Sequence, residues 1–189
     1  NETQPNGDVN QYWDPASMSS DGSFIMAGAD GGRLFKSSNT GGSWTEVRPA
    51  DDFDKNWRTI SMSTDGTNII AGARSGRLYI STNSGGWWGE TRPAGDVNQN
   101  WYSTSMSGDG SIIIASAYSG RVYISTNSGA VWTETNPTGI EENKTWRTTS
   151  MSSDGTIMIA GIFGGRLFKS NNTGGSWTEV RPADDFDKN

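Results

Sequence analysis

The chain has 189 residues, of which 32% are hydrophobic and 11% aromatic, and its formal net charge is −6. Its ten Arg and five Lys never form a run, so the basic stripe that binds nucleic acid is missing and nucleic acid is not an expected partner. The sequence contains no Cys and no His, which excludes disulfides and thiolate metal sites and removes the commonest general base.

The chain begins partway through a pattern that recurs later in the sequence. The stretch ETQPNGDVNQYW at 2–13 aligns with ETRPAGDVNQNW at 90–101, and NTGGSWTEVRPADDFDKN occurs identically at 39–56 and 172–189. Residues 1–12 therefore supply a partial fourth strand and loop that duplicate the end at 178–189. This duplication favours either a segment of a longer tandem array or a unit whose ends meet neighbouring copies, and a recombined sequence is a third alternative.

Four copies of one unit follow each other along the chain. Each unit opens with Trp, carries Met five residues later, and then has Asp-Gly. The opening residues, spaced by 44, 44 and 45 positions, are Trp13, Trp57, Trp101 and Trp146. The Met residues are Met18, Met62, Met106 and Met151, and the Asp-Gly pairs lie at 21–22, 65–66, 109–110 and 154–155. The predicted units are approximately 13–56, 57–100, 101–145 and 146–189.

Each unit is expected to form four short strands. In the second unit the expected strands are 57–63, 68–73, 77–81 and 87–92, and the turns between them are rich in Gly, Ser and Asn. Asp-Gly is the strongest short hairpin signal, and both of its residues are expected at positive φ. Repeats of 40–50 residues with four short strands are typical of propeller blades. The sequence therefore predicts an all-β fold, a single β-propeller domain over 1–189 built of four-stranded antiparallel blades.

The turn before each fourth strand resembles a known repeat motif. The stretches SSNTGGSW, STNSGGWW, STNSGAVW and SNNTGGSW resemble the Asp-box, or BNR repeat, of the sialidase, sortilin and photosystem-assembly propellers. The resemblance covers nearly the whole chain, but Asn replaces the Asp of the motif in every copy. The matching positions are Asn39, Asn83, Asn127 and Asn172 with Trp44, Trp88, Trp132 and Trp177. Because Asn also hydrogen-bonds to the turn backbone, the turn is expected to survive.

In such a propeller the loops between the second and third strands share one face with the loops that connect the blades. This face varies between the four units, whereas the turns of the opposite face are nearly uniform. Varied loops are where binding residues concentrate, so a ligand is expected on the varied face, although drift in unconstrained loops is an alternative. The candidate ligand-binding residues are Asp30, Arg74, Tyr118 and Phe163, with Trp87 as an additional aromatic residue that could instead fill a gap between blades.

Two further groups of residues repeat around the chain. Arg33, Arg77, Arg121 and Arg166 follow the Gly turn of each unit. A ring of Arg can capture a carboxylate or sulfate, but strict repetition favours stacking on a blade Trp or pairing with a loop carboxylate. Asp52, Asp54 and Asn56 place oxygen atoms at alternate positions, as at the start of a calcium loop. The Gly and the distal Glu of such a loop are missing, so solvated turn residues are favoured and no cofactor is expected.

The resemblance alone leaves several classes of function open. The function expected first is that of a non-catalytic, lectin-like extracellular binding module. Such a module would be secreted or at the cell surface and would bind a carbohydrate or protein ligand. A structural building block of an oligomeric or filamentous assembly, self-associating through the duplicated ends, is the alternative. A glycosidase-like enzyme is disfavoured, because an active site breaks repeat symmetry and the repeats offer no defensible carboxylate pair. No apolar run is long enough to span a membrane, the longest being IIIASA at 112–117.

Overall fold

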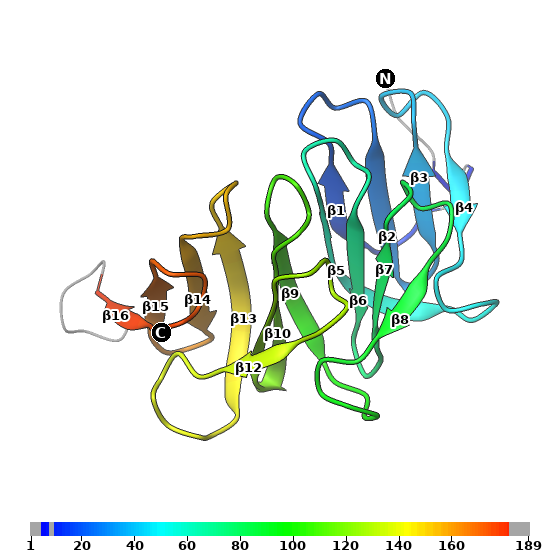
Figure 1. Ribbon diagram of the computed structural model, residues 1–189. Coiled ribbons are helices and arrows are strands. Elements are labelled where there is room, and N and C mark those ends of the chain that lie inside the picture. Colours follow the sequence, from blue (N-terminus) through cyan, green and yellow to red (C-terminus); the bar gives the residue numbers. More distant parts are fainter. Residues whose placement is uncertain (1–4, 8–9, 182–189) are drawn as a thin grey trace.

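The computed structural model describes residues 5–7 and 10–181, and the regular structure of this part is entirely β (Figure 1). The all-β prediction is confirmed. Among the residues described, no helix has the length and apolar character of a membrane span. The sixteen strands found there are β1 (Trp13–Met18), β2 (Ile25–Gly32), β3 (Leu34–Ser37), β4 (Thr45–Val47), β5 (Lys55–Met62), β6 (Ile69–Ala73), β7 (Leu78–Ser81), β8 (Gly89–Thr91), β9 (Trp101–Met106), β10 (Ile113–Gly120), β11 (Val122–Ser125), β12 (Thr133–Thr135), β13 (Lys144–Met151), β14 (Met158–Ile162), β15 (Leu167–Ser170) and β16 (Thr178–Val180).

Each successive group of four strands forms an antiparallel blade in which neighbours in sequence are neighbours in space. In the second blade, β5 pairs with β6, β6 with β7 and β7 with β8. The predicted fourth strand at 87–92 is shorter in the structure, because Trp87 and Trp88 belong to the turn that precedes β8. The first strand is longer than predicted, because Lys55 and Asn56 pair with the blade before.

Neighbouring blades are joined by short stretches of strand pairing. At the first junction Asp30 lies opposite Asn56 and Gly32 opposite Lys55, so β2 pairs with β5. The third junction repeats this pairing between β10 and β13, and the second is reduced to a bridge between Gly76 and Gln99. These pairings hold each blade to the start of the next one.

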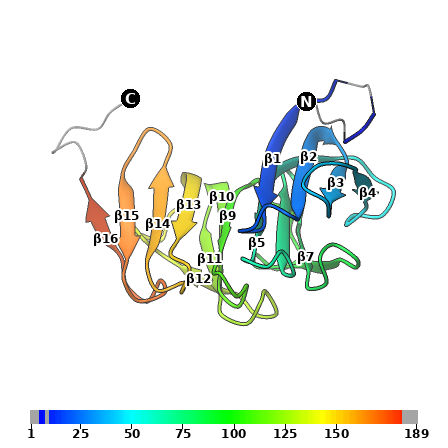
Figure 2. The same ribbon diagram turned by 90° about the horizontal axis from the view of Figure 1, so that it is seen from above.

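The four blades form an open arc rather than a closed ring. The first strands lie side by side along its inner edge, with β1 next to β5, β5 next to β9, and β9 next to β13. Figures 1 and 2 show β1 and β13 separated by the two blades between them. Within the described residues, the first and last blades therefore each present one face that no other blade covers.

The apolar core is divided into three clusters, one between each pair of successive blades. The opening Trp of the following blade lies in each cluster, and Trp57 is typical of the three, being 1% exposed. Its Cβ lies 3.1 Å from the position that a Cβ on Gly28 would occupy, and its ring meets Tyr79 edge-on at 5.8 Å. A glycine in the second strand thus lets the Trp of the next blade approach the sheet closely.

The Asp-Gly turns differ in one respect from the prediction. Gly22 has a φ of 71°, but Asp21 is not among the described residues with positive φ, and the same holds in the other three blades. The expectation that both residues take positive φ was wrong. The Asp21 carboxylate instead accepts hydrogen bonds from Ser19 Oγ and Ser23 N, at 2.7 and 3.0 Å. These bonds favour the charged form and lower the pKa of Asp21 to about 2.

The Asn side chains of the turns before the fourth strands do hydrogen-bond to their own turns. Asn39 Oδ1 accepts from Ser37 Oγ at 2.9 Å and from Ser43 N at 2.8 Å. The residue that takes positive φ is the next one, Thr40, at 57°. The other three turns repeat these features at Asn83, Asn127 and Asn172.

From the second blade on, the Trp residues that close these turns pack against the preceding blade. Trp132 Nε1 donates to Thr91 Oγ1 at 2.7 Å, and Trp177 makes the same bond to Thr135. At the first junction Val47 occupies the position of that Thr, and Trp88 Nε1 is buried without a hydrogen-bond partner among the described residues.

Candidate binding face

The two ends of the blades are distinguished by backbone hydrogen bonds. On one end, Asp30 N donates to Tyr12 O and Arg74 N to Asn56 O, both at 2.8 Å, so the second-strand ends lie against the connecting loops. On the other end, Thr40 N donates to Ser23 O, which joins the Asn turn to the Asp-Gly turn. The varied positions predicted from the sequence therefore share one face, which we call the loop face.

On the loop face, side chains from successive blades form a continuous row. The Arg58 guanidinium lies 5.9 Å from the ring centre of Tyr102, and the Arg147 guanidinium lies 5.5 Å from the same ring. Arg147 also lies 4.8 Å from the ring of Phe163, and Tyr118 packs against Tyr102 at 5.0 Å. Three blades thus contribute cationic and aromatic side chains to one surface, which we call the aromatic–arginine row.

The first blade closes one end of the row with two carboxylates. Arg58 forms ion pairs with Asp14, in a very short contact, and with Asp30 at 2.9 Å. Burial by itself would lower the pKa of the Arg58 guanidinium. The hydrogen bond to Asp14 and the charges of Asp14 and Asp30 outweigh burial, so the pKa is raised. Its Nε is buried without a partner among the described residues. Arg58 is therefore a fixed cation held in place by its neighbours.

Two other arginines of this face, Arg147 and Arg74, have no carboxylate partner among the described residues. Arg147 is exposed, and in the described part of the chain its guanidinium contacts only aromatic rings. Arg74 is also exposed, and the described residues offer its side chain no acceptor. A guanidinium donates paired hydrogen bonds to a carboxylate, and an aromatic ring offers a flat apolar face. The row can therefore bind a ligand by ion pairing and stacking.

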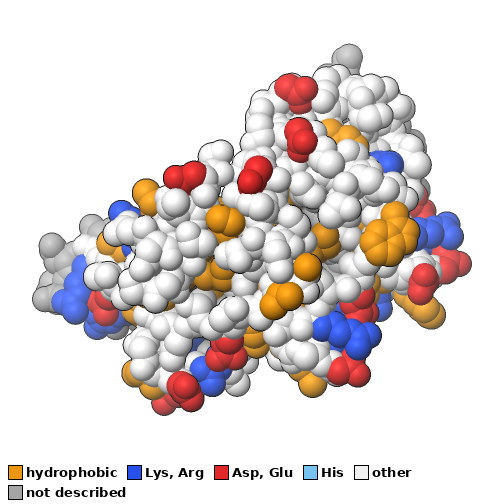
Figure 3. Space-filling model, in the orientation of Figure 1, with side chains coloured by type: hydrophobic (Ala, Val, Ile, Leu, Met, Phe, Trp, Pro, Cys, Tyr) orange, Lys and Arg blue, Asp and Glu red, His pale blue; other side chains and the backbone are white. Residues whose placement is uncertain are grey.

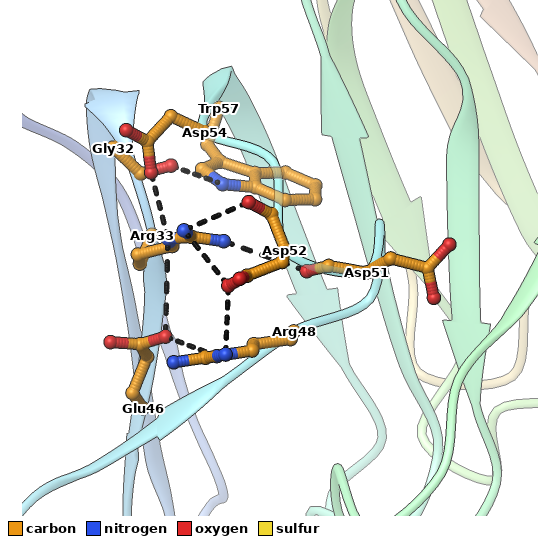
Figure 4. A network of polar contacts seen from close by, with 8 residues as sticks. All are labelled: Gly32, Arg33, Glu46, Arg48, Asp51, Asp52, Asp54 and Trp57. Atoms are coloured by element: carbon orange, nitrogen blue, oxygen red, sulfur yellow. Dashed lines mark hydrogen bonds and ion pairs between the residues drawn. The ribbon is translucent and has the colours of Figure 1, made fainter.

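The repeated arginines that follow the Gly turns contact carboxylates of loops or outer strands, and Figure 4 shows this network for Arg33. Arg33 pairs with Asp54 at 2.7 Å and with Asp52 at 3.2 Å, and it donates to the Asp52 carbonyl at 3.0 Å. Arg77 pairs with Asp96 at 2.8 Å. Arg121 and Arg166 contact Glu134 and Glu179 at 3.5 and 2.5 Å. Arg33 and Arg77 thus hold carboxylates of the connecting loops, whereas Arg121 and Arg166 contact carboxylates of the fourth strands, β12 and β16.

Two of the three candidate calcium ligands, Asp52 and Asp54, form ion pairs in the network around Arg33. Asp52 is shared between Arg33 and Arg48, and Asp54 pairs with Arg33 (Figure 4). Asn56 lies in the strand pairing with Asp30, and its carbonyl accepts from Arg74. Opposite charges therefore already neutralise these carboxylates. Figure 3 shows the resulting mixture of basic and acidic side chains along the rim of the arc.

Trp87 lies apart from the aromatic–arginine row. It is 68% exposed, and a Cβ on Gly89 would lie 2.8 Å from its ring. It borders a groove of about 540 Å³ between the second and third blades, together with Val131 and Pro93. The structure therefore brings together Asp30, Tyr118 and Phe163, keeps Arg74 on the same face, and places Trp87 beside the Asn turns.

The sequence did contain a signal for the residues of the row that were missed. The position after the opening Trp holds three different residue types in the four units, being Asp14, Arg58, Tyr102 and Arg147. It varies nearly as much as the turn position of Asp30, where all four units differ. Because it lies within an expected strand, it was treated as part of the blade and not as part of the varied face.

The comparisons with known proteins support the fold. No protein-family model and no curated protein matches the sequence, whereas many solved structures do. An ancestral GH74 enzyme has a TM-score of 0.74 at 18% identity, over 97% of this chain and 26% of its own. YCF48 from Cyanidioschyzon merolae has a TM-score of 0.68 at 14% identity, over 96% of this chain and 60% of its own. A structure of YCF48 bound to D1 peptide has a TM-score of 0.57 at 10% identity, over 91% of this chain and 83% of its own.

These similarities define the chain as a set of β-propeller blades. It spans about a quarter of the GH74 structure and three fifths of the YCF48 structure. At such low identities the likeness extends to the fold alone, since one propeller architecture serves many functions.

Proposed function

We propose that the chain is a non-catalytic binding module whose ligand lies on the loop face, along the aromatic–arginine row. The observation that carries the proposal is the unbroken contact from Arg58 through Tyr102 and Arg147 to Phe163, which joins three blades. A surface of this extent suits an elongated ligand more than a compact one.

The chemistry of the row favours a peptide that bears carboxylates. Exposed Arg74, on the same face, offers paired donors to a carboxylate, and the rings of Tyr102 and Tyr118 offer a stacking surface. Aromatic and Arg side chains are the residues that most often dominate protein recognition. A similarly folded protein, YCF48, has been determined bound to a peptide, which supports this class of ligand.

The test is a binding screen of the chain against immobilised acidic, neutral and basic peptides, with a glycan array in parallel. We expect binding to acidic peptides, and substitution Tyr102→Ala or Arg74→Ala should weaken it about tenfold, equivalent to roughly 1.4 kcal/mol. Trp87→Ala is the matched control, because it removes an exposed aromatic side chain outside the row.

Two results would overturn the proposal. One is binding that Trp87→Ala abolishes and Tyr102→Ala leaves unchanged, which would move the site to the groove beside Trp87. The other is binding to glycans alone, which would replace the peptide by a carbohydrate.

A second candidate function, a structural building block, is favoured by the open arc. The first and last blades each have an uncovered face among the described residues, and apolar side chains lie on both, including Trp13 and Phe163. Exposed apolar surface of this kind is typical of an interface with another chain.

A further inference from the structure

The uncovered face of the first blade carries residues whose counterparts in the following blades are buried or partly buried. Trp13 is 41% exposed, whereas its counterpart Trp57 is 1% exposed. Met18 is 61% exposed, whereas Met62 is 8% exposed. Trp57 and Met62 are covered because a preceding blade packs on them, and the described residues provide no such blade for Trp13 and Met18.

The last blade presents the complementary half of the same interface. A Cβ on Gly72 would lie 3.0 Å from the Cβ of Trp101, because the next blade covers that glycine. Among the described residues, a Cβ on Gly161, the corresponding residue of the last blade, would meet only its own blade, namely Thr148 and Leu167. A hollow of about 590 Å³ lies over this glycine. The surface that receives the opening Trp of a next blade is thus present, and no other described residue covers it.

A series of backbone hydrogen bonds links each blade to the next, and it leaves a free donor at one end of the arc and a free acceptor at the other among the described residues. Ser20 N donates to Thr64 O at 2.9 Å, Thr64 N to Gly108 O at 2.8 Å, and Gly108 N to Ser153 O at 2.7 Å. Every blade therefore donates to the next one. Across the described part of the chain, Ser153 N–H has no acceptor and the Ser20 carbonyl has no donor. The last blade therefore offers a donor, the N–H of Ser153, and the first blade offers the matching acceptor, the carbonyl of Ser20.

The charges at the two ends are complementary as well. At the internal junctions, the residue after the opening Trp contacts its counterpart in the preceding blade, as Arg58 contacts Asp14 and Arg147 contacts Tyr102. A first blade placed after the last blade would therefore bring Asp14 to Arg147. The pair has opposite charges, and Arg147 has no other carboxylate partner among the described residues.

A contact between the outer parts of neighbouring blades also runs from one blade to the next. Lys36 Nζ donates to the carbonyls of Ser84 and Gly85 in the Asn turn of the next blade, at 3.2 and 3.3 Å. Lys169 occupies the same position in the last blade, within the identical stretch RLFKS. If the first blade of a second copy followed the last blade, its Asn turn would offer Lys169 the carbonyls of Thr40 and Gly41.

From these matches we infer that copies of this chain associate head to tail through a repeat of the internal blade junction. Trp13 of one copy packs over Gly161 of the other, and Asp14 pairs with Arg147. The inference rests on the second candidate function and gives it a defined interface. The contact joins two different surfaces, so it closes into a ring or continues as a filament, depending on the angle between successive copies.

The test is light scattering of the 189-residue chain over a concentration series. We expect a mass that rises above 20.4 kDa with concentration. Trp13→Ala and Arg147→Glu should each weaken association at least tenfold. Trp87→Ala and Arg92→Glu are the matched controls, since they remove an exposed ring or reverse an exposed charge away from both end faces. Circular dichroism establishes that every variant is folded.

A mixing experiment tests the polarity of the interface. The Trp13→Ala chain keeps an intact last blade, and the Arg147→Glu chain keeps an intact first blade. Each variant alone should be monomeric, and an equimolar mixture should form a species of twice 20.4 kDa that grows no further. A wild-type mass that stays at 20.4 kDa overturns the inference, as does a mixture that remains monomeric. Neither result affects the peptide screen, whose variants Tyr102→Ala and Arg74→Ala lie in the middle blades.

Discussion

Equivalent tryptophans of different blades should differ in their contribution to stability, and the comparison of Trp57→Ala with Trp13→Ala measures this difference. Trp57 is 1% exposed and donates from Nε1 to Gly32 O at 3.1 Å. Removing about 200 Å² of buried surface at about 25 cal/mol per Å² costs roughly 5 kcal/mol. Trp13 is 41% exposed, so about three fifths of that value, or roughly 3 kcal/mol, is expected. Water fills the space that Trp13 leaves, so no cavity adds to this cost.

The assay is urea unfolding followed by far-ultraviolet circular dichroism, at the lowest protein concentration that gives a usable signal. Circular dichroism is preferred to fluorescence because both variants lose a tryptophan. We expect Trp57→Ala to be less stable than Trp13→Ala by about 2 kcal/mol, with a similar dependence on urea. Equal losses would refute the reasoning, because they would mean that the first blade is covered as completely as the second in the isolated chain.

Two further predictions concern single contacts. Val47→Thr should stabilise the chain by about 1 kcal/mol, because the new hydroxyl can accept a hydrogen bond from the buried Trp88 Nε1, as Thr91 does from Trp132. Val180→Thr is the control, and equal effects of the two substitutions on the thermal midpoint would contradict this prediction. Hydrogen bonds lower the pKa of Asp21 and Asp109 from 3.8 to about 2, so the stability that these carboxylates contribute is full above about pH 4 and is lost as the pH falls towards 2. The double variant Asp21→Asn/Asp109→Asn should therefore lose less of its thermal midpoint than the wild type between pH 4 and pH 2, and parallel curves would disprove this assignment.

The fold could be predicted because its signals are local and repeated. The alternation around Trp57, the Asp-Gly pair and the Gly-rich turns recur four times, so each strand was indicated by four independent copies. The start of β5 at Lys55 was missed because it depends on pairing with Gly32 in another blade. The φ of Asp21 was mispredicted because its side chain accepts hydrogen bonds within the turn, which dipeptide preference does not show.

The candidate site was less predictable, because it arises between blades. Asp30, Tyr118 and Phe163 were found from their variation, but their link to Arg58 and Tyr102 depends on how the blades stack. The open arc has the same origin. Small residues in the first strands suit several ring sizes, and the angle between blades is not encoded in any single repeat.

The central claim is that the aromatic–arginine row is the binding surface. The most direct measurement is a nuclear magnetic resonance titration of the labelled chain with the peptide that binds most strongly in the screen. The account predicts that the amide shifts concentrate at Arg74, Tyr102 and Tyr118. Shifts confined to the opposite end of the blades, around Asn83 and Trp87, would contradict it.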